Sequence, residues 1–156
     1  MSANRGKYAE DKVREFFNEW AKAHSGFCYN RILDAHSARG AMANPQPGDF
    51  QWFNLGKGGV ASNGLIEVKE VEHDRLLPYK NFGPDQVGRM RIRQMAGSQP
   101  LVLVCFRPKN GYTFWRGVPL SYFQVRDKSR GSWDLSEFAE HLKVNILLEE
   151  YLRDNT

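Results

Sequence analysis

Three residues of types that bind metal ions and activate water lie close together in the chain. Asp49 follows a Pro-Gly turn at the start of one apolar stretch, and Glu67 and Lys69 lie two positions apart in the next. A short Gly-rich turn between the stretches predicts a hairpin that brings Asp49 beside Glu67. Two adjacent carboxylates favour a hard cation such as Mg²⁺. A neighbouring lysine can position an attacking water and offset the charge that develops on a phosphate.

The same strand pattern has a second interpretation, in which the polar residues only face solvent. Glu67 and Lys69 share one face of the expected strand with Leu65, whereas Ile66 and Val68 point to the other face, toward the core. A half-exposed strand places its polar side chains in water without any function. The expected hairpin, the repulsion between two adjacent carboxylates and the nearby lysine weigh against this second interpretation.

The charge of the chain is concentrated in its middle. The net charge is +4, but residues 75–130 contain eleven Lys and Arg against two Asp and Glu. Residues 1–74 are nearly neutral, and residues 131–156 are acidic. A central basic segment favours a polyanionic partner such as nucleic acid, because binding to phosphates releases counterions. A solvated basic surface is the alternative. The spread of these cations over the segment does not fit an amphipathic membrane-surface helix.

Length and composition predict one globular domain. The chain has 156 residues, of which 41% are hydrophobic, and its longest apolar run, residues 101–106, has six. A membrane span needs about 20, so none is expected, and the polar first 25 residues predict no signal peptide. Cys28 and Cys105 form no CxxC pair, which excludes a thiolate zinc site and disfavours a disulfide framework. We therefore expect a cytoplasmic protein with no membrane partner.

Apolar periodicity and turn residues divide the chain into helices, strands and loops. Helices are expected at residues 6–24, 84–97 and 134–152, and a short helical turn at 119–124. Strands are expected at residues 27–33, 49–55, 65–70, 101–106 and 112–116. Residues 35–48, 56–64 and 71–83 are expected as loops or turns, the first of them projecting. The order predicts a single α/β domain over residues 1–156, with a mixed central sheet flanked by helices and residues 131–156 packing on the core.

Several motifs together resemble a known nuclease superfamily. PGD, then 17 residues, then EVK resembles the PD-(D/E)xK signature. RGKYAEDKV resembles the family's first helix, whose sheet-facing acid corresponds to Glu10. LPYKNFGPDQVGRM is similar to the stretch after the catalytic strand in RecU-type Holliday junction resolvases, where a helical glutamine corresponds to Gln86. The resemblance extends over about residues 5–125.

The resemblance implies a fold, an activity and a set of site residues. It implies a restriction-endonuclease-like domain that hydrolyses DNA with Mg²⁺, or with Mn²⁺ in its place, and leaves a 5′-phosphate. Asp49, Glu67 and Glu10 would be metal ligands, and Lys69 and Gln86 would complete the catalytic set. A homodimer would make paired symmetric cuts in branched DNA, above all in four-way junctions, because a two-fold dimer matches a symmetric substrate.

The departures from the resolvase pattern leave the substrate open. Pro47-Gly48 replaces two threonines, Val68 replaces an alanine, and Asp85 replaces a histidine. The segment corresponding to the junction-inserting projection is shorter or different at residues 35–48. A nuclease for flaps, nicks or duplex ends is therefore one alternative. A catalytically inactive DNA-binding module of the same fold is another, although all the acidic ligands and the lysine are present.

Basic residues around these motifs are candidates for contacts with DNA phosphates. Gln86, Arg89 and Arg93 fall on one face of the expected helix over residues 84–97. The other candidates lie beside the projecting loop, in the Gly-rich turn and in the KNF stretch: Arg31, Arg39, Lys57 and Lys80. His73 lies close enough in sequence to reach the site, although a surface position is the alternative.

Overall fold

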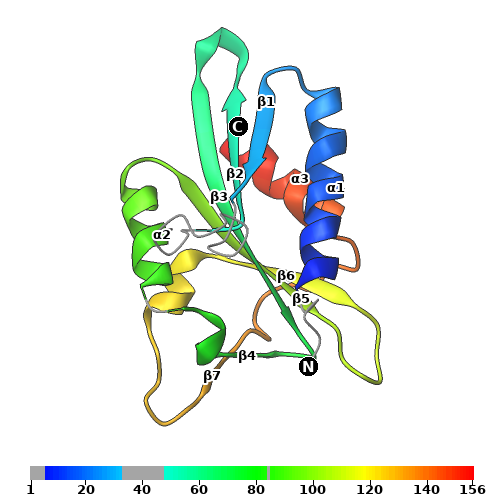
Figure 1. Cartoon of the computed structure of the whole chain (residues 1–156), viewed down its shortest axis with the longest axis vertical. Coiled ribbons are helices and arrows are strands. Elements are labelled where there is room, and N and C mark those ends of the chain that lie inside the picture. Colours follow the sequence, from blue (N-terminus) through cyan, green and yellow to red (C-terminus); the bar gives the residue numbers. More distant parts are fainter. Residues whose placement is uncertain (1–5, 33–47, 84) are drawn as a thin grey trace, which may run out of the picture.

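The computed structural model describes residues 6–32, 48–83 and 85–156. Its centre is a five-stranded sheet in the order β1-β2-β3-β5-β6 (Figure 1). The strands are Phe27–Arg31 (β1), Phe50–Leu55 (β2), Ala61–Val71 (β3), Gln99–Phe106 (β5) and Phe114–Val118 (β6). β3 and β5 run parallel, and the other three pairs are antiparallel. This mixed sheet confirms the predicted α/β class.

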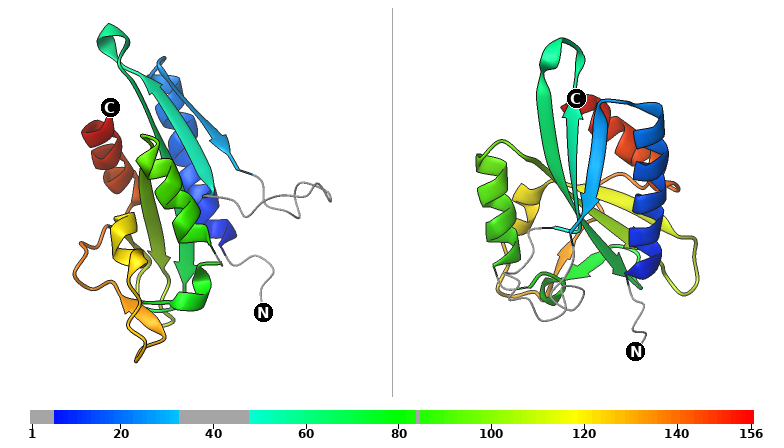
Figure 2. Two further views of the ribbon diagram at one scale, coloured as in Figure 1. Left: turned by 90° about the vertical axis from the view of Figure 1, so that its left-hand side faces the viewer. Right: turned by 45° about the horizontal axis from the view of Figure 1, so that its top comes forward.

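Helices cover both faces of the sheet (Figure 2). Lys7–Ala23 (α1) and Val144–Asn155 (α3) pack on one face, and Gln86–Met95 (α2) packs on the other. α1 adopts its place because its apolar residues recur at helical spacing and form one buried stripe. β5 is apolar from Leu101 to Phe106 because both of its faces are covered there.

Two hydrophobic clusters, one on each face, make up the core. Leu103 and Cys105 point toward α1 and α3, while the alternate residues of β5, Val102 and Val104, point toward α2. On β3, Ile66 and Val68 belong to the α1–α3 side, as the alternation predicts. Glu67 and Lys69 therefore face the side of the sheet that carries α2.

The β2–β3 hairpin is longer than the sequence suggested. β3 begins at Ala61, and the expected turn over residues 56–64 shrinks to a tip around the 3₁₀ turn Lys57–Gly59 (η1). Gly64 lies inside the strand, where a Cβ would stand 2.4 Å from Trp52 Nε1 and 2.5 Å from the Gln99 carbonyl oxygen. The glycine is thus a close-approach residue of the strand, and its position resembles a turn signal only in sequence.

A second, two-stranded sheet lies on the α2 side. Leu76–Pro78 (β4) pairs antiparallel with Ser132–Asp134 (β7). β4 lies within residues 71–83, which were expected to form a loop. Two 3₁₀ turns, Tyr79–Asn81 (η2) and Leu120–Gln124 (η3), follow β4 and β6, and η3 matches the expected helical turn.

The expected helix over residues 134–152 is wrong in its first half, because α3 begins only at Val144. Leu135 packs with Phe138 in the cluster on the α2 side, whereas Leu147 and Leu148 of α3 pack on the opposite face. Leu142, which lies at helical spacing from Leu135 in the sequence, is exposed. One straight helix cannot serve both faces of the sheet, so the segment before Val144 is irregular.

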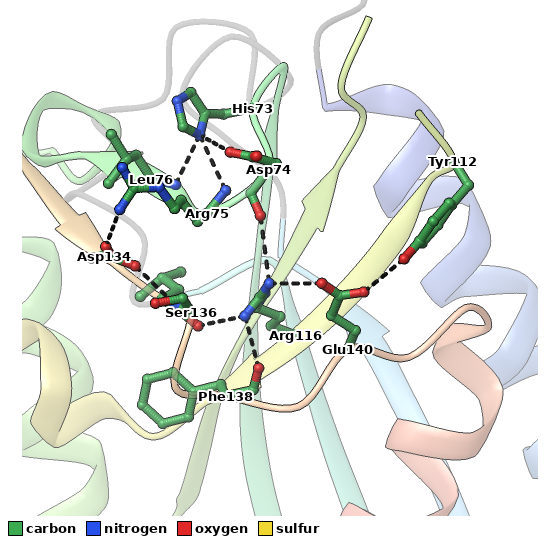
Figure 3. A network of polar contacts seen from close by, with 11 residues as sticks. His73, Asp74, Arg75, Leu76, Tyr112, Arg116, Asp134, Ser136, Phe138 and Glu140 are labelled. Atoms are coloured by element: carbon green, nitrogen blue, oxygen red, sulfur yellow. Dashed lines mark hydrogen bonds and ion pairs between the residues drawn. The ribbon is translucent and has the colours of Figure 1, made fainter. Parts of the chain in front are cut away.

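Arg116 of β6 ties this irregular segment to the sheet (Figure 3). Its side chain is buried, and its Nη1 donates to the carbonyl oxygens of Leu135 and Phe138, both at 2.8 Å. Its Nη2 donates to Glu140 Oε1 at 3.1 Å. One of the eleven cations of the basic segment is therefore a structural residue that cannot meet a polyanion.

Neither cysteine forms a disulfide in the described parts of the chain. Cys28 is exposed on β1, and Cys105 is buried in β5. Burial raises the pKa of the Cys105 thiol to about 12. Among the residues that the structure describes, no helix combines the length and apolar composition needed to cross a bilayer.

Candidate metal-binding and catalytic site

The hairpin brings Asp49 directly opposite Glu67, as its register predicts. Phe50 pairs with Ile66, so the next pair along the ladder is Asp49 and Glu67. The Asp49 N–H donates to the Ile66 carbonyl oxygen at 2.8 Å, and the Val68 N–H donates to Asp49 Oδ2 at 2.7 Å. Both the backbone and the side chain of Asp49 are thus fixed to β3. The two carboxylates share one face of the sheet.

Glu67 is a buried acid, and this excludes the solvated interpretation of the strand. Its exposed fraction is 3%. Glu67 Oε1 lies 2.7 Å from Lys69 Nζ, whereas Oε2 is buried and has no hydrogen-bond partner among the described residues. A buried carboxylate oxygen without a partner is costly unless it binds something. Burial, and secondly the charge of Glu67, raise the pKa of Asp49 well above its ordinary value.

Lys69 of β3 is held by three groups: Glu67 on its own strand, Phe82, and Gln86 in the first turn of α2. Besides Glu67, its Nζ lies 3.3 Å from Gln86 Oε1 and 4.7 Å from the centroid of the Phe82 ring. The Gly83 N–H also donates to Gln86 Oε1, at 3.4 Å. Gln86 therefore links the lysine to the first turn of α2. The structure brings together Asp49, Glu67, Lys69 and Gln86, four of the five residues predicted for catalysis.

The donor set fits a hard divalent cation. Mg²⁺ takes oxygen ligands and is usually bound by one or two carboxylates, with its other positions left for water and phosphate. Asp49 and Glu67 supply two carboxylates, and the orphaned Glu67 Oε2 is one oxygen available to the ion. In the described ranges, no three His, Cys, Asp or Glu side chains converge closely enough to hold a metal. Asp49 and Glu67 are thus the two carboxylates that the described residues place side by side here.

Glu10, the fifth predicted residue, comes from the other side of the sheet. It lies in the first turn of α1, and its Oε2 is 2.6 Å from Arg31 Nη2. Its charge still contributes to the raised pKa of Asp49, so it lies within electrostatic reach of the pair. Arg31 of β1 forms an ion pair with this acid, so part of its charge is already neutralised before any contact with DNA. Ligation by Glu10 stays a prediction.

Sequence reasoning missed Glu70, which positions α1. Gly6 precedes the helix and has no side chain to cap it. Glu70 Oε1 instead accepts the Ala9 N–H at 3.0 Å, and Oε2 lies 3.4 Å from Arg107 Nη1. An acid at a helix N-terminus also complements the helix dipole. Its position in the strand could have revealed it. Glu70 is a charged residue on the same face of β3 as the apolar Ile66 and Val68, because every second residue of a strand shares a face.

The predicted DNA contacts are divided by the fold. Lys57 lies at the tip of the β2–β3 hairpin, about 20 Å along the strands from the carboxylate pair, so the structure does not bring it to the site. Lys80 is exposed on η2, close to Phe82. Arg89 is half-buried and Arg93 exposed on α2. Arg39 lies outside the described residues, and so do residues 35–47 of the projection that was expected over residues 35–48.

His73 has a local structural role in this structure (Figure 3). Its Nδ1 accepts the backbone N–H groups of Arg75 at 3.1 Å and of Leu76 at 3.0 Å. These bonds shape the turn that leads from β3 to β4. His73 is half-exposed, and a reach to the candidate site stays a prediction.

Comparisons with known proteins give likenesses among solved structures alone. No family model matches the chain, and no curated protein matches it. Among solved structures, the chain is similar to the 1.6 Å structure of Hjc, a Holliday junction resolvase from the archaeal hyperthermophile Archaeoglobus fulgidus. The match covers 88% of this chain and 98% of that chain, with 19% identity and a TM-score of 0.48. The site residues are therefore assigned from their own geometry.

Proposed function

We propose that the protein is a divalent-metal-dependent DNA endonuclease of the PD-(D/E)xK type. The observation that carries the proposal is the opposed pair of Asp49 and Glu67 with Lys69 bonded to it. The orphaned oxygen of Glu67 and the raised pKa of Asp49 both support a cation between these acids. The basic central segment supplies the charge that a polyanionic substrate requires.

Asp49 and Glu67 would hold Mg²⁺, with Mn²⁺ as a substitute. The bound ion would supply a Lewis acid next to the scissile phosphate and make water more nucleophilic. Lys69 offers an ammonium group whose position is set by Glu67 and Gln86, so it can orient the water for in-line attack. The same charge offsets the negative charge that builds up on the phosphate oxygens. The expected product carries a 5′-phosphate.

The preferred substrate that we propose is a four-way DNA junction, cut in a symmetric pair of sites by a homodimer. The order of the PGD, EVK and KNF motifs with Gln86 supports this choice. Each subunit would provide one site, and the two-fold axis would match that of the junction. We also propose that the protein acts in the cytoplasm.

Cleavage of labelled DNA tests this function. The purified protein is incubated with Mg²⁺ and with a four-way junction, a flap, plain duplex or single strand. Asp49→Asn removes one ligand charge but keeps an oxygen that can accept the Val68 N–H, so its fold is preserved. Lys69→Ala tests the lysine, and Asp154→Asn, at an exposed position on α3, serves as the matched control.

We expect paired symmetric nicks in the junction, lost in the Asp49→Asn and Lys69→Ala proteins and retained in the control. Cleavage of flaps or duplex as well, with the same loss, would keep the nuclease and change its substrate. Binding without any cleavage would support the inactive module instead. Cleavage that survives Asp49→Asn would show that the metal site is elsewhere.

A further inference from the structure

A groove of about 440 Å³ lies between η2 and the first turn of α2. Phe82 forms part of its wall, and the Lys69 ammonium lies 4.7 Å from the centroid of the same ring. The groove thus adjoins the candidate site and has a lining of its own. A DNA strand that passes Lys69 on the side of Phe82 would reach this groove next.

Two cations of different character line this groove: Lys80 and Arg126. The Arg126 guanidinium lies 5.3 Å from the centroid of the Tyr79 ring and 5.2 Å from that of Trp133. Its Nη2 also lies 3.5 Å from the Tyr79 carbonyl oxygen. Two rings and a carbonyl therefore orient the guanidinium while leaving it exposed. Lys80 is exposed and forms no ion pair with the residues described here.

The eleven cations of residues 75–130 fall into two groups. One group is engaged by acids: Arg75, Arg107, Lys109, Arg116 and Arg130. The second group forms no ion pair among the described residues: Lys80, Arg89, Arg91, Arg93, Arg126 and Lys128. The second group is carried by η2, by α2 and by the segment after η3. These elements are the borders of the groove, so the charge available to a polyanion surrounds it.

The backbone of the groove is open to close approach. Gly83 and Gly88 line it, and a Cβ added to either would meet no atom within 4 Å. A bulky backbone can therefore approach the chain closely at these positions. Asp85 also lines the groove, with a φ of 66° and no side-chain hydrogen bond to the helix that it precedes. Its carboxylate would repel a phosphate, so it provides a test of opposite sign.

We propose that this groove is a second phosphate subsite, in which Lys80 and Arg126 bind the DNA backbone next to the phosphate that is cut. The proposal rests on the nuclease function above and adds the path of the strand. It assigns Arg126 to substrate binding, a role to which the motifs give no clue. It also explains why the cation is held on aromatic rings and is not left as a freely moving side chain.

Equilibrium binding of labelled DNA to the Asp49→Asn protein tests the subsite, because no strand is cut during the measurement. Lys80→Ala and Arg126→Ala are each added to this background and titrated over a range of salt concentrations. Each should weaken binding about tenfold at moderate salt and reduce the salt slope by about one. Arg153→Ala is the control, since this exposed arginine lies on α3, across the sheet from the groove.

Asp85→Asn should change the DNA affinity in the opposite direction to Lys80→Ala and Arg126→Ala. Asparagine tolerates positive φ as aspartate does, so the backbone is kept while one negative charge is removed. We expect it to tighten DNA binding severalfold. The side chains of Lys80 and Asp85 form no hydrogen bond with the described residues, so Lys80→Ala and Asp85→Asn report on charge even if loss of Arg126 loosens its aromatic neighbours. In the active protein, Lys80→Ala should raise KM more than it lowers kcat.

The outcomes separate the subsite from the nuclease. If the active protein cuts DNA but the groove variants bind like Arg153→Ala, the subsite is overturned and the nuclease stands. If no DNA is cut but binding follows the expected signs, the subsite stands and the nuclease fails. If the Asp49→Asn protein binds no DNA at all, the subsite is overturned, and the nuclease is overturned with it only where the active protein also cuts no DNA.

Discussion

At the residue scale, the opposed carboxylates of Asp49 and Glu67 lower the folding stability of the metal-free protein. The same arrangement suits them to bind a cation. Asp49 is half-buried beside Glu67, and both its desolvation and this neighbour raise its pKa. At neutral pH without metal, ionised Asp49 therefore costs folding free energy. Such opposed like charges are typical of sites that are completed by a ligand, and they are rarely optimal for the empty protein.

Asp49→Asn should therefore stabilise the metal-free protein while abolishing cleavage. The substitution removes one of two repelling charges and retains an acceptor for the Val68 N–H. We expect Tm in EDTA to rise by a few degrees, since about 1 kcal/mol corresponds to roughly 3 °C in a domain of this size. Asp154→Asn should leave Tm nearly unchanged. A lower Tm for Asp49→Asn would contradict the repulsion.

The pH dependence of stability follows from the same raised pKa. Folded Asp49 holds its proton more tightly than unfolded Asp49, whose pKa is about 3.9. Its contribution is thus fully present below that value and is lost as pH rises through the raised pKa. In EDTA, the Tm gap between Asp49→Asn and wild type should widen from acid to neutral pH. Mg²⁺ should narrow it by stabilising the wild type.

At the scale of elements, α1 is docked by a side chain from the sheet. Glu70 of β3 caps the helix at Ala9 and contacts Arg107, in place of a capping residue at Gly6. Glu70→Ala should lower the free energy of unfolding by about 1 kcal/mol, as loss of a helix cap does. Urea denaturation measures it. A double-mutant cycle with Arg107→Ala should show coupling, whereas additive losses would mean that the two residues act separately.

The hairpin that carries the carboxylates depends on Gly64. A Cβ there would collide with Trp52 and with the Gln99 carbonyl oxygen, so Gly64→Ala should lower Tm strongly and disturb the opposition of Asp49 and Glu67. Gly88→Ala is the matched substitution, because Gly88 lies in α2 with open space around it. It should stabilise the protein by up to about 1 kcal/mol. Thermal melts of both variants test this contrast.

At the scale of the whole molecule, the proposed dimer predicts how many DNA strands are cut in each binding event. Mixed dimers of wild-type and Asp49→Asn subunits would contain one competent site, so they should nick one strand of a four-way junction without the paired second cut. Gel analysis of a supercoiled or labelled junction distinguishes the two products. Paired cuts by purified mixed dimers would show that one site serves both strands.

The fold was predictable where one pattern matched one environment. α1, β2 and β5 follow their periodicities because each buries a regular stripe or a continuous apolar run. The error at residues 134–152 arose because Leu135 and Leu147 have helical spacing in sequence but pack on opposite faces of the sheet. β4 and β7 have three residues each, too few to show any period.

The candidate site was predictable to the extent that it is local. The opposition of Asp49 and Glu67 follows from a hairpin, and the contact of Lys69 with Gln86 follows from the motif that joins them. Lys57 lies away from the carboxylate pair because it is at the tip of the hairpin and the pair is at the far end, and its contact with DNA stays a prediction. Glu70 and Arg126 were missed because each has a partner from a distant part of the chain, Ala9 for Glu70 and Tyr79 for Arg126.

The contrast between the two cysteines makes the natural protein suitable for site-specific labelling. Cys28 is exposed on β1, three residues from Arg31, while Cys105 is buried with its thiol pKa raised to about 12. A maleimide dye should therefore attach at one position in the native protein and at two in denaturant. A fluorophore at Cys28 would report the approach of DNA to this edge of the sheet without any engineered residue.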